Sequence, residues 1–508
     1  MLENTPAATA ATSDDRVQEW ARALGNSYAL LPERFYTRID PTPVAKPHLV
    51  RFNRGLAADL GLDSEGLDTN ALASIFSGNR LIPGSHPLAM AYAGHQFGQF
   101  VPQLGDGRAI LLGDVRDRSG KRRDIQLKGS GRTPYSRSGD GRAAVGPVLR
   151  EYLVSEAMHA LGIPATRALA AVTTGEAVFR EQRVPGAVLT RVAASHVRVG
   201  TFQYFAARGD TEGTRRLADF VIERHYPELA SAANPYLELL RSVVSRQARL
   251  VAGWMNVGFI HGVMNTDNMA VSGETIDFGP CAFMDGYDPA TVFSSIDHRG
   301  RYAYVNQPAA AQWNLARFAE TLLPHIDAVN ERAIELATEA VSEFAAQFDG
   351  SWLAGMRRKL GLFMEEADDA ALSKRLLDLM QGGHADYTRT FRQLCTVAQG
   401  SAAGTAFYDS FSDRDALQDW VAGWRERLSR EPQPASERAA FMRLANPAVI
   451  PRNHRVEQAI VAAEHDDYAP FDELNRVLSR PYEDQPAFAA YMDAPLPEER
   501  VLQTFCGT

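Results

Sequence analysis

Two polar side chains near the middle of the chain have the types and spacing of a divalent-cation site. Asn268 ends the segment His-Gly-Val-Met-Asn-Thr-Asp-Asn, and Asp277 follows in Thr-Ile-Asp-Phe-Gly. Amide and carboxylate oxygens are hard ligands of the kind that Mg²⁺ or Mn²⁺ takes when it bridges nucleotide phosphates. We expect a short apolar strand before Asp277 and a glycine turn after it. The two segments therefore predict a metal site suited to phosphate chemistry.

The same segments match part of the catalytic loop of protein kinases. That loop has the pattern H-R-D-L-x-x-x-N, followed by D-F-G, and its first Asp is the catalytic base. His261 and Asn268 stand at the His and Asn positions, whereas Val263 stands where the base would be. A valine cannot accept a proton, so the chain keeps the metal-binding groups of a phosphotransferase without its usual base. An ordinary polar loop followed by a turn is the alternative.

Lys128 is a candidate phosphate ligand because it ends the segment Asp-Ile-Gln-Leu-Lys, which we expect to form a strand. The helix expected next, over residues 146–163, carries Glu151 and Glu156. A strand lysine paired with a helix glutamate grips the α- and β-phosphates in kinases. The spacing does not choose between the two glutamates, and a surface lysine beside two solvated glutamates is the alternative.

Glycine- and arginine-rich segments surround this strand and helix. Gly105, Gly107 and Arg108 lie at the start of a strand, where backbone N–H groups can approach a phosphate. The loop after the lysine strand contains Asp140 and Gly141. Four arginines in and after this loop would suit a polyphosphate: Arg132, Arg137, Arg142 and Arg150. A flexible linker with surface arginines is the alternative. Arg191 and Arg198 lie on and just beyond a later predicted strand, where a structural role is the alternative.

The elements expected around these residues make an α+β protein. Residues 107–115 and 122–129, joined by a polar turn, predict a β-hairpin, and further strands are expected at 176–180 and 185–193. Residues 212–258 and almost all of the chain beyond 308 have helical periodicity. A glycine-rich loop, a strand ending in lysine, a helix and more strands follow the order of a kinase N-lobe.

We therefore expect a protein-kinase-like two-lobed fold with an N-terminal extension and a large helical C-terminal extension. At 508 residues the chain is too long for a single compact core. The expected parts are a disordered leader (1–16), an N-terminal extension (17–84), a kinase-like N-lobe (85–207), a C-lobe with the catalytic loop and D-F-G (208–308), and the helical C-lobe remainder with a C-terminal extension (309–508).

Composition excludes several other functions. A formal net charge of −9 argues against a general binder of nucleic acids or membrane surfaces, which are usually basic. The sequence has no apolar run of about 18 residues that would predict a transmembrane helix. Three cysteines in this length do not make a disulfide framework and fit a reducing compartment. We expect a cytoplasmic monomer with no nucleic-acid or membrane partner.

Seven segments together resemble the selenoprotein O family, the kinase-fold protein adenylyltransferases. They span residues 92–460: YAGHQFGQFVPQLGDGRA, IQLKGSGRTPYSRSGDGRA, LREYLVSEAMHALGIP, VLTRVAASHVRVGTFQYF, HGVMNTDNM, IDFGPCAFMD and NPAVIPRNHRVEQAI. Eukaryotic members carry selenocysteine near the C-terminus. This chain has Cys506 there and so resembles the cysteine-containing bacterial members.

The resemblance implies an activity that explains the missing kinase base. Members of the family bind ATP in a flipped orientation, so that the α-phosphorus faces the acceptor. AMP is transferred to a Ser, Thr or Tyr hydroxyl of a protein, and pyrophosphate leaves. A base placed at Val263 for γ-phosphoryl transfer would then serve no purpose, and the resemblance implies that Asp267 acts from another direction.

The resemblance also assigns roles to individual residues. Asp267 would be the proton acceptor, and Asn268 and Asp277 would bind Mg²⁺ or Mn²⁺. Lys128 would hold phosphate, with Glu151 rather than Glu156 as its helix partner. The nucleotide pocket would be lined by Gly105, Gly107, Arg108, Asp140, Gly141, Arg191 and Arg198.

The family's redox role suggests a reversible disulfide between Cys281, just after the D-F-G, and Cys506. Two unrelated reduced thiols are the alternative. Other functions also stay open at this point: a protein uridylyltransferase using UTP with Mn²⁺, a small-molecule phosphotransferase, and a non-catalytic nucleotide-binding scaffold. The acceptor proteins are not identified by the sequence, and the chain itself, with its Ser, Thr and Tyr near residue 135, is one candidate.

Overall fold

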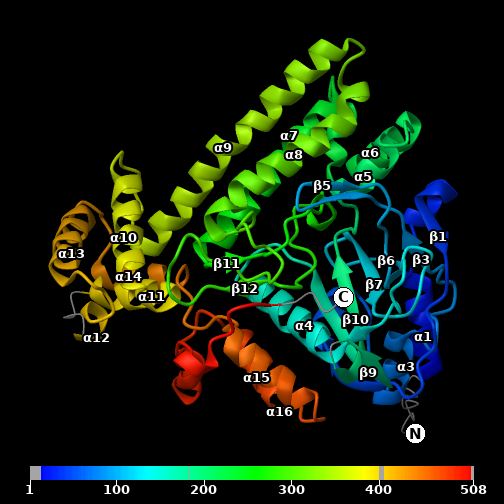
Figure 1. Cartoon of the computed structure of the whole chain (residues 1–508), viewed down its shortest axis with the longest axis horizontal. Coiled ribbons are helices and arrows are strands. Elements are labelled where there is room, and N and C mark those ends of the chain that lie inside the picture. Colours follow the sequence, from blue (N-terminus) through cyan, green and yellow to red (C-terminus); the bar gives the residue numbers. More distant parts are fainter. Residues whose placement is uncertain (1–12, 181, 400–404, 505–508) are drawn as a thin grey trace, which may run out of the picture.

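An antiparallel sheet of eight strands forms one end of the molecule (Figure 1). The computed structural model describes residues 13–180, 182–399 and 405–504. The strand order is β1-β3-β6-β7-β10-β9-β2, and β8 pairs with β10. The strands are β1 (Tyr36–Arg38), β2 (His48–Phe52), β3 (Leu88–Met90), β6 (Ala109–Arg116), β7 (Arg122–Lys128), β8 (Ala143–Ala144), β9 (Arg167–Phe179) and β10 (Arg183–Ala193). The segment expected as an N-terminal extension thus supplies β1 and β2 to this sheet.

The strands predicted around Lys128 are confirmed. The β-hairpin forms as β6 and β7, and Lys128 is the last residue of β7. The two later strands form as β9 and β10, which pair with each other. β9 begins at Arg167, well before the predicted start. Its alanine-rich first half is buried on both faces, so it lacks the alternation of apolar and polar residues by which a half-exposed strand is predicted.

Helices cover both faces of this sheet. On one face, Val188 of β10 packs with α1 (Ser13–Ala23), α2 (Arg54–Asp59) and α3 (Thr69–Ser77). On the other face, Ala187 and Leu189 pack against α4 (Val145–Ala160), because successive residues of a strand point to opposite sides. α1 begins at Ser13, so the end of the segment predicted as a leader is helical, and residues 1–12 lie outside the described residues.

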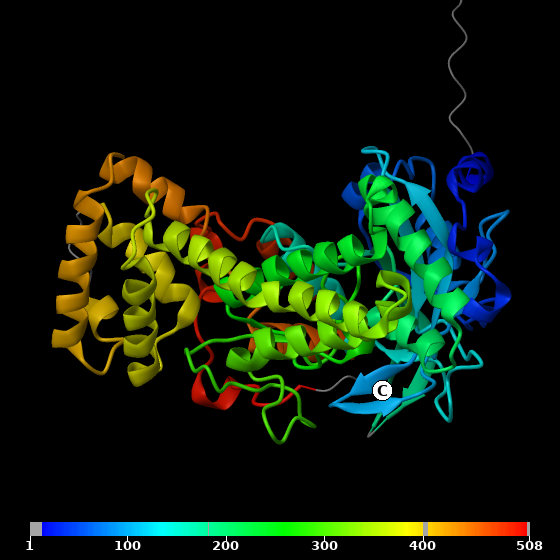
Figure 2. The same ribbon diagram turned by 90° about the horizontal axis from the view of Figure 1, so that it is seen from above.

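The rest of the described chain is mostly helical, as predicted, and the protein is α+β. Helices α7, α8 and α9 pack side by side across the middle of the molecule (Figure 2). The helices are α5 (Val199–Ala206), α6 (Thr211–His225), α7 (Pro235–Asn256), α8 (Gln307–Ile326), α9 (Asn330–Leu360), α10 (Asp369–Gly383), α11 (Tyr387–Val397), α12 (Thr405–Tyr408), α13 (Arg414–Ser429), α14 (Ala435–Arg443), α15 (Asn453–Ala463) and α16 (Ala469–Leu478). Across the described ranges, none of the helices is long and apolar enough to cross a membrane.

Short elements connect these parts. Two small sheets pair β4 (Gly94–Gln96) with β5 (Gln99–Val101) and β11 (Phe259–Ile260) with β12 (Ala282–Phe283). The 3₁₀ turns are η1 (Tyr28–Leu30), η2 (Glu33–Phe35), η3 (Pro227–Ser231), η4 (Thr266–Asn268), η5 (Tyr304–Asn306), η6 (Pro486–Tyr491) and η7 (Pro497–Glu499). The β4–β5 hairpin and η4 lie at the site described below.

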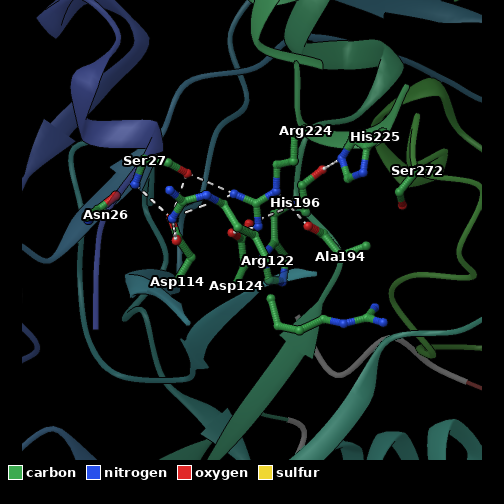
Figure 3. Close-up of polar contacts among 12 residues, drawn as sticks. Asn26, Ser27, Asp114, Arg122, Asp124, Ala194, His196, Arg224, His225 and Ser272 are labelled. Carbon is green, nitrogen blue, oxygen red and sulfur yellow. Dashed lines mark hydrogen bonds and ion pairs between the residues drawn. The ribbon is translucent and has the colours of Figure 1, made fainter. Parts of the chain in front are cut away.

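A buried ion network joins the sheet to α6 (Figure 3). Arg224 donates to Asp124 Oδ1 at 2.5 Å and to Ser27 Oγ at 2.9 Å, and it lies 3.7 Å from Asp114 Oδ2. The backbone N–H of His196 donates to Asp124 Oδ2 at 3.0 Å. Burial lowers the pKa of His196 to about 4, although Asp124 opposes this shift. The ring is therefore neutral at pH 7, and Arg224 supplies the charge that balances Asp124.

Arg224→Ala tests this network, because it leaves Asp124 buried with the neutral His196 as its side-chain partner. Breaking a buried ion pair from one side typically costs about 3–5 kcal/mol, so we expect the free energy of unfolding to fall by that amount. Arg215→Ala is the matched control, since Arg215 lies on the same helix and pairs with an exposed Asp219. Denaturant unfolding measures both variants, and equal losses would contradict the proposed role of Arg224.

Candidate active site

The segment around Asp277 lies against the catalytic loop. β11 and β12 flank the two segments and pair antiparallel, and His261 Nε2 donates to the carbonyl of Ile276 at 3.0 Å. The strand predicted before Asp277 does not form. Thr275 instead makes isolated bridges to Ala165 and Met269, because it lies where three chain segments meet. Asp277 itself has a φ of 69°, a conformation that is strained for a non-glycine residue and recurs at functional sites.

A cleft of about 620 Å³ opens between the sheet and the catalytic loop. Its walls contain nine of the residues singled out from the sequence: Gly105, Gly107, Arg108, Arg137, Asp140, Gly141, Arg142, Asp267 and Asp277. These positions are far apart in the chain, and the fold brings them to one cavity. The cleft also has walls that the sequence analysis did not select, among them Tyr92, Gln96, Tyr135 and Phe179.

Glycines let two loops pack closely along one wall of the cleft. Gly105 has a φ of 95°, and a Cβ there would lie 2.4 Å from the ring of Tyr135. Gly141 has a φ of 72°, and its Cβ would lie 2.2 Å from the backbone of Gly131. Thr133 Oγ1 donates to the carbonyl of Asp106 at 2.7 Å and ties the loops together. Side chains at these glycines would push the loops apart, which is why the wall can present backbone to a ligand.

Four charged side chains meet at the base of the cleft. Lys128 Nζ lies 2.6 Å from Glu151 Oε2 and 2.5 Å from Asp277 Oδ1. Arg191 Nη2 lies 2.8 Å from Glu151 Oε1 and 3.3 Å from Asp277 Oδ1. Each cation therefore contacts both carboxylates, and the cluster as a whole is neutral. Glu156, the other candidate partner of Lys128, pairs instead with Arg167 at 2.8 Å.

The cluster keeps Asp277 ionised. Burial alone would raise the pKa of this carboxyl group, but Lys128 and Arg191 outweigh it and hold the pKa well below the usual range. An ionised carboxylate in a cleft is a ready ligand for a divalent cation, whose arrival would compete with Lys128 for the same oxygen.

One of the two polar side-chain atoms of Asn268 is used in a hydrogen bond within the catalytic loop. Its Nδ2 donates to the carbonyl of Val263 at 3.0 Å, which leaves Oδ1 as the atom able to bind a cation. Its side chain is not part of the cleft wall that contains Asp277. Within the described residues, no cluster of three or more His, Cys, Asp or Glu side chains could hold a metal. The oxygens of Asn268 and Asp277 are of the type that Mg²⁺ or Mn²⁺ takes together with phosphate and water oxygens, and a joint metal site of the two residues stays a prediction.

Asp267 lies in the cleft with its carboxylate largely buried. Burial raises its pKa to about 6, although the nearby Arg198 opposes this shift. Gln96 Nε2 lies 3.4 Å from Asp267 Oδ2, whereas no described residue donates a hydrogen bond to the buried Oδ1. A Cβ on Gly94 would lie 2.5 Å from that same Oδ1. Oδ1 is therefore buried against the hairpin, and Asp267 lines the cleft with its other atoms.

Arg198 lies under Asp267 rather than in the open cleft. It donates to the backbone carbonyl of Asp267 at 2.8 Å, lies 3.8 Å from Asp106 Oδ1, and covers the ring of Tyr92 at 4.7 Å. Asp106 is buried and accepts from Gln126 Nε2 at 3.1 Å. Tyr92 and Asp106 thus fix the side chain of Arg198, a role that the sequence analysis did not assign to them.

The β4–β5 hairpin is the largest feature of the site that sequence reasoning missed. Three consecutive residues dock on the catalytic loop: His95 N donates to Thr266 Oγ1 at 2.7 Å, Phe97 N to Asn265 Oδ1 at 2.9 Å, and Gln96 reaches Asp267. The only signal in the sequence is the short polar segment Gly-His-Gln-Phe-Gly with its two glycines. Nothing in that segment indicates a partner about 170 positions away.

The predicted redox pair is described only in part. Cys281 is buried, and the C-terminal tail reaches its neighbourhood, where Thr504 Oγ1 donates to the carbonyl of Pro280 at 2.5 Å. Cys506 lies outside the described residues, so the disulfide stays a prediction.

Comparison with known proteins identifies the family of the chain. A family model described as "Protein adenylyltransferase SelO" matches residues 22–479. The "Protein nucleotidyltransferase YdiU" of Rhizobium meliloti (strain 1021) is 65% identical over 484 residues, which cover 95% of this chain and 99% of that relative. A relative of the same description from Bradyrhizobium sp. (strain BTAi1) is 62% identical over 484 residues, covering 95% and 98%. The chain therefore belongs to the SelO protein adenylyltransferase family of enzymes.

Proposed function

We propose that the protein transfers AMP from ATP to Ser, Thr or Tyr hydroxyls of proteins and releases pyrophosphate. The observation that carries this proposal is that Asp267 shares one cleft with Asp277, while Val263 stands at the position of the kinase base. A carboxyl group with a raised pKa can act as a general base, and an ionised carboxylate can hold a divalent cation, and both groups suit nucleotidyl transfer to a hydroxyl. Family membership supports the same reaction class.

We also infer a kinase-like two-lobed organisation, with an N-lobe over 85–207 and a C-lobe over 208–308. The support is the order of the parts: a strand lysine on β7, its glutamate partner on α4, and a catalytic loop followed by Asp-Phe-Gly. The β1 and β2 strands complete the sheet of the N-lobe, and helices α8 to α16 enlarge the C-terminal part.

The residues of the cleft can be matched to the steps of the reaction. Attack of the acceptor oxygen on the α-phosphorus breaks the bond to pyrophosphate, on which negative charge develops. Lys128 and Arg191 are the fixed cations that would stabilise this charge, whereas Arg198 lies under Asp267. Asp267 would take the proton from the acceptor hydroxyl, a contribution of about 10²–10⁴-fold in rate for a general base. A Mg²⁺ or Mn²⁺ held by Asn268 and Asp277 would add charge stabilisation on the phosphates.

The identity of the nucleotide is the main alternative within this proposal. The relatives are named nucleotidyltransferases, and that description covers UMP transfer from UTP with Mn²⁺ as well as AMP transfer. The cleft walls formed by Asp140 and Arg108 do not by themselves select a purine. A small-molecule phosphotransferase is less favoured, because Val263 occupies the position where such an enzyme has its catalytic Asp. A non-catalytic scaffold is less favoured, because it would not need Asp267 in the cleft.

Labelled ATP tests the proposed reaction. The protein is incubated with Mg²⁺ or Mn²⁺, a mixed protein acceptor, and ATP labelled at either the α- or the γ-phosphate, with labelled UTP in parallel. We expect label on protein from α-ATP only, and its loss in both Asp267→Ala and Asp277→Ala, because the first lacks the base and the second the metal ligand. Label from γ-ATP would contradict the proposal and favour a kinase, and label from UTP alone would replace AMP by UMP.

Gln96→Ala tests the environment of Asp267. Removing the amide takes away the side-chain donor of that carboxylate without touching the cations that hold phosphate. We expect kcat for AMP transfer to fall about tenfold, a fraction of the whole contribution of a general base, with the affinity for ATP little changed. Gln99→Ala, on the exposed part of the same hairpin, is the matched control. A fall in ATP affinity with kcat preserved would contradict a role of Gln96 at Asp267.

A further inference from the structure

The helices α15 and α16 return from the C-terminal part of the chain to pack on α4 (Figure 1). The helices approach closely, since a Cβ on Gly146 of α4 would lie 2.9 Å from Ile460 of α15. Tyr152 of α4 and Phe471 of α16 have ring centroids 5.5 Å apart. α4 carries Glu151, so these helices contact the element that supplies the glutamate partner of Lys128.

One buried side chain of α4 joins three parts of the chain. Arg150 is only 4% exposed, and its Nη1 donates to Asn453 Oδ1 at 2.8 Å and to the carbonyl of Cys281 at 3.4 Å. Its Nη2 donates to Glu457. Asn453 and Glu457 belong to α15, and Cys281 follows the Asp-Phe-Gly segment. A buried guanidinium that donates in two directions fixes its own backbone more firmly than apolar contact does.

α15 is itself anchored beside the same segment. Arg452, which precedes its first residue, is 1% exposed in its side chain and lies 2.5 Å from Asp285 Oδ1 and 2.9 Å from Asp386 Oδ2. It also donates to the carbonyl of Met492 at 2.9 Å. Asp285 lies shortly after Cys281, so α15 holds a fixed place relative to the chain that carries Asp277.

Arg150 and Glu151 are consecutive residues of a rigid helix, so their positions are coupled. A rotation or a shift of α4 that breaks the contact of Glu151 with Lys128 at 2.6 Å would also pull Arg150 away from Asn453. Conversely, contacts that hold Arg150 limit the movement of Glu151. Such small displacements matter, because a catalytic group misplaced by about 1 Å can cost about 10²-fold in rate.

We propose that Arg150 is a positioning residue: together with Asn453 and Glu457 of α15, it holds α4 so that Glu151 meets Lys128. α15 thereby acts on the nucleotide site from outside the cleft. The inference rests on the proposed function for the identity of the ligand, ATP with a divalent cation.

A double-mutant cycle tests the proposal through nucleotide binding, which requires no transfer. The affinity for ATP with Mg²⁺ is measured by calorimetry for the full chain and for Arg150→Ala, Glu151→Gln and the double variant. We expect each single change to weaken binding about five- to tenfold. The double variant should bind no more weakly than the weaker single variant, because Arg150 acts through Glu151. Losses that multiply in the double variant would overturn the proposal.

Two further variants separate positioning from general destabilisation. Arg51→Ala removes an exposed pair with Asp472 that also joins α16 to the sheet, and it should bind ATP as the unmodified chain does. The charge exchange Arg150→Glu with Glu457→Arg should bind ATP more tightly than Arg150→Glu alone, because it restores the ion pair with α15 although not the hydrogen bond to the carbonyl of Cys281. Affinity for ATP in Arg150→Ala equal to that in Arg51→Ala would overturn the proposal.

The proposed function can fail without this inference failing. If the unmodified protein binds ATP but transfers no AMP, the adenylyltransferase proposal is wrong, and the binding cycle still decides the role of Arg150. If it transfers AMP, we expect kcat to fall about 10–100-fold in Arg150→Ala at a temperature where both Arg150→Ala and Arg51→Ala are folded. The melting temperature of Arg150→Ala should be the lower of the two, because its buried contacts are lost. An unchanged kcat in Arg150→Ala would then count against the positioning role as well.

Discussion

The site depends on one electrostatic constraint: four charges are buried together and must neutralise one another. Lys128 and Arg191 each contact both Glu151 and Asp277. A buried ion left without its partner is costly, so removing any one of the four would leave an uncompensated charge. The constraint also explains why the cluster suits phosphate chemistry. Its two cations are already held in place by carboxylates. When a divalent cation binds, Asp277 would exchange its contact with Lys128 for a contact with the metal.

The rest of the fold brings these four residues together from distant parts of the chain. β7 and β10 are neighbours in the sheet and supply the two cations, and α4 lies across that sheet and supplies Glu151. The β11–β12 pairing brings Asp277 to the same place. A second buried network, centred on Arg224 and Asp124, fixes α6 and the junction after β10. Helices α15 and α16 pack on α4, and Arg150 of α4 donates hydrogen bonds to Asn453 and Glu457 of α15.

The sequence predicts correctly those parts of the site in which a functional side chain lies on an element with a clear local pattern. The β6–β7 hairpin has polar turn residues between apolar runs, so Lys128 was expected at a strand end and is found there. The choice of Glu151 over Glu156 came from the family resemblance, because residues five apart on one helix do not differ in pattern. The strand expected before Asp277 does not form. Thr275 lies between two other segments of the chain and makes one isolated bridge to each, at Ala165 and at Met269.

What sequence reasoning missed depends on long-range contacts. Gln96 and Gly94 matter because a hairpin folds back on a loop far along the chain, and neither residue type marks that contact. The loop composition predicts polyphosphate binding by Arg150, whereas the structure directs its side chain to Asn453 of α15. Such roles follow from the packing of elements, which the periodicity of a single segment does not determine.

The orientation of the bound nucleotide tests the central claim most directly. A crystal structure with Mn²⁺ and an ATP analogue that carries a methylene group between the α- and β-phosphates would show both the metal and the phosphates. We expect anomalous scattering from Mn²⁺ beside Asp277, with the α-phosphorus as the phosphorus nearest to Asp267. A γ-phosphorus nearest to Asp267, with the α-phosphorus deep beside Lys128, would contradict it.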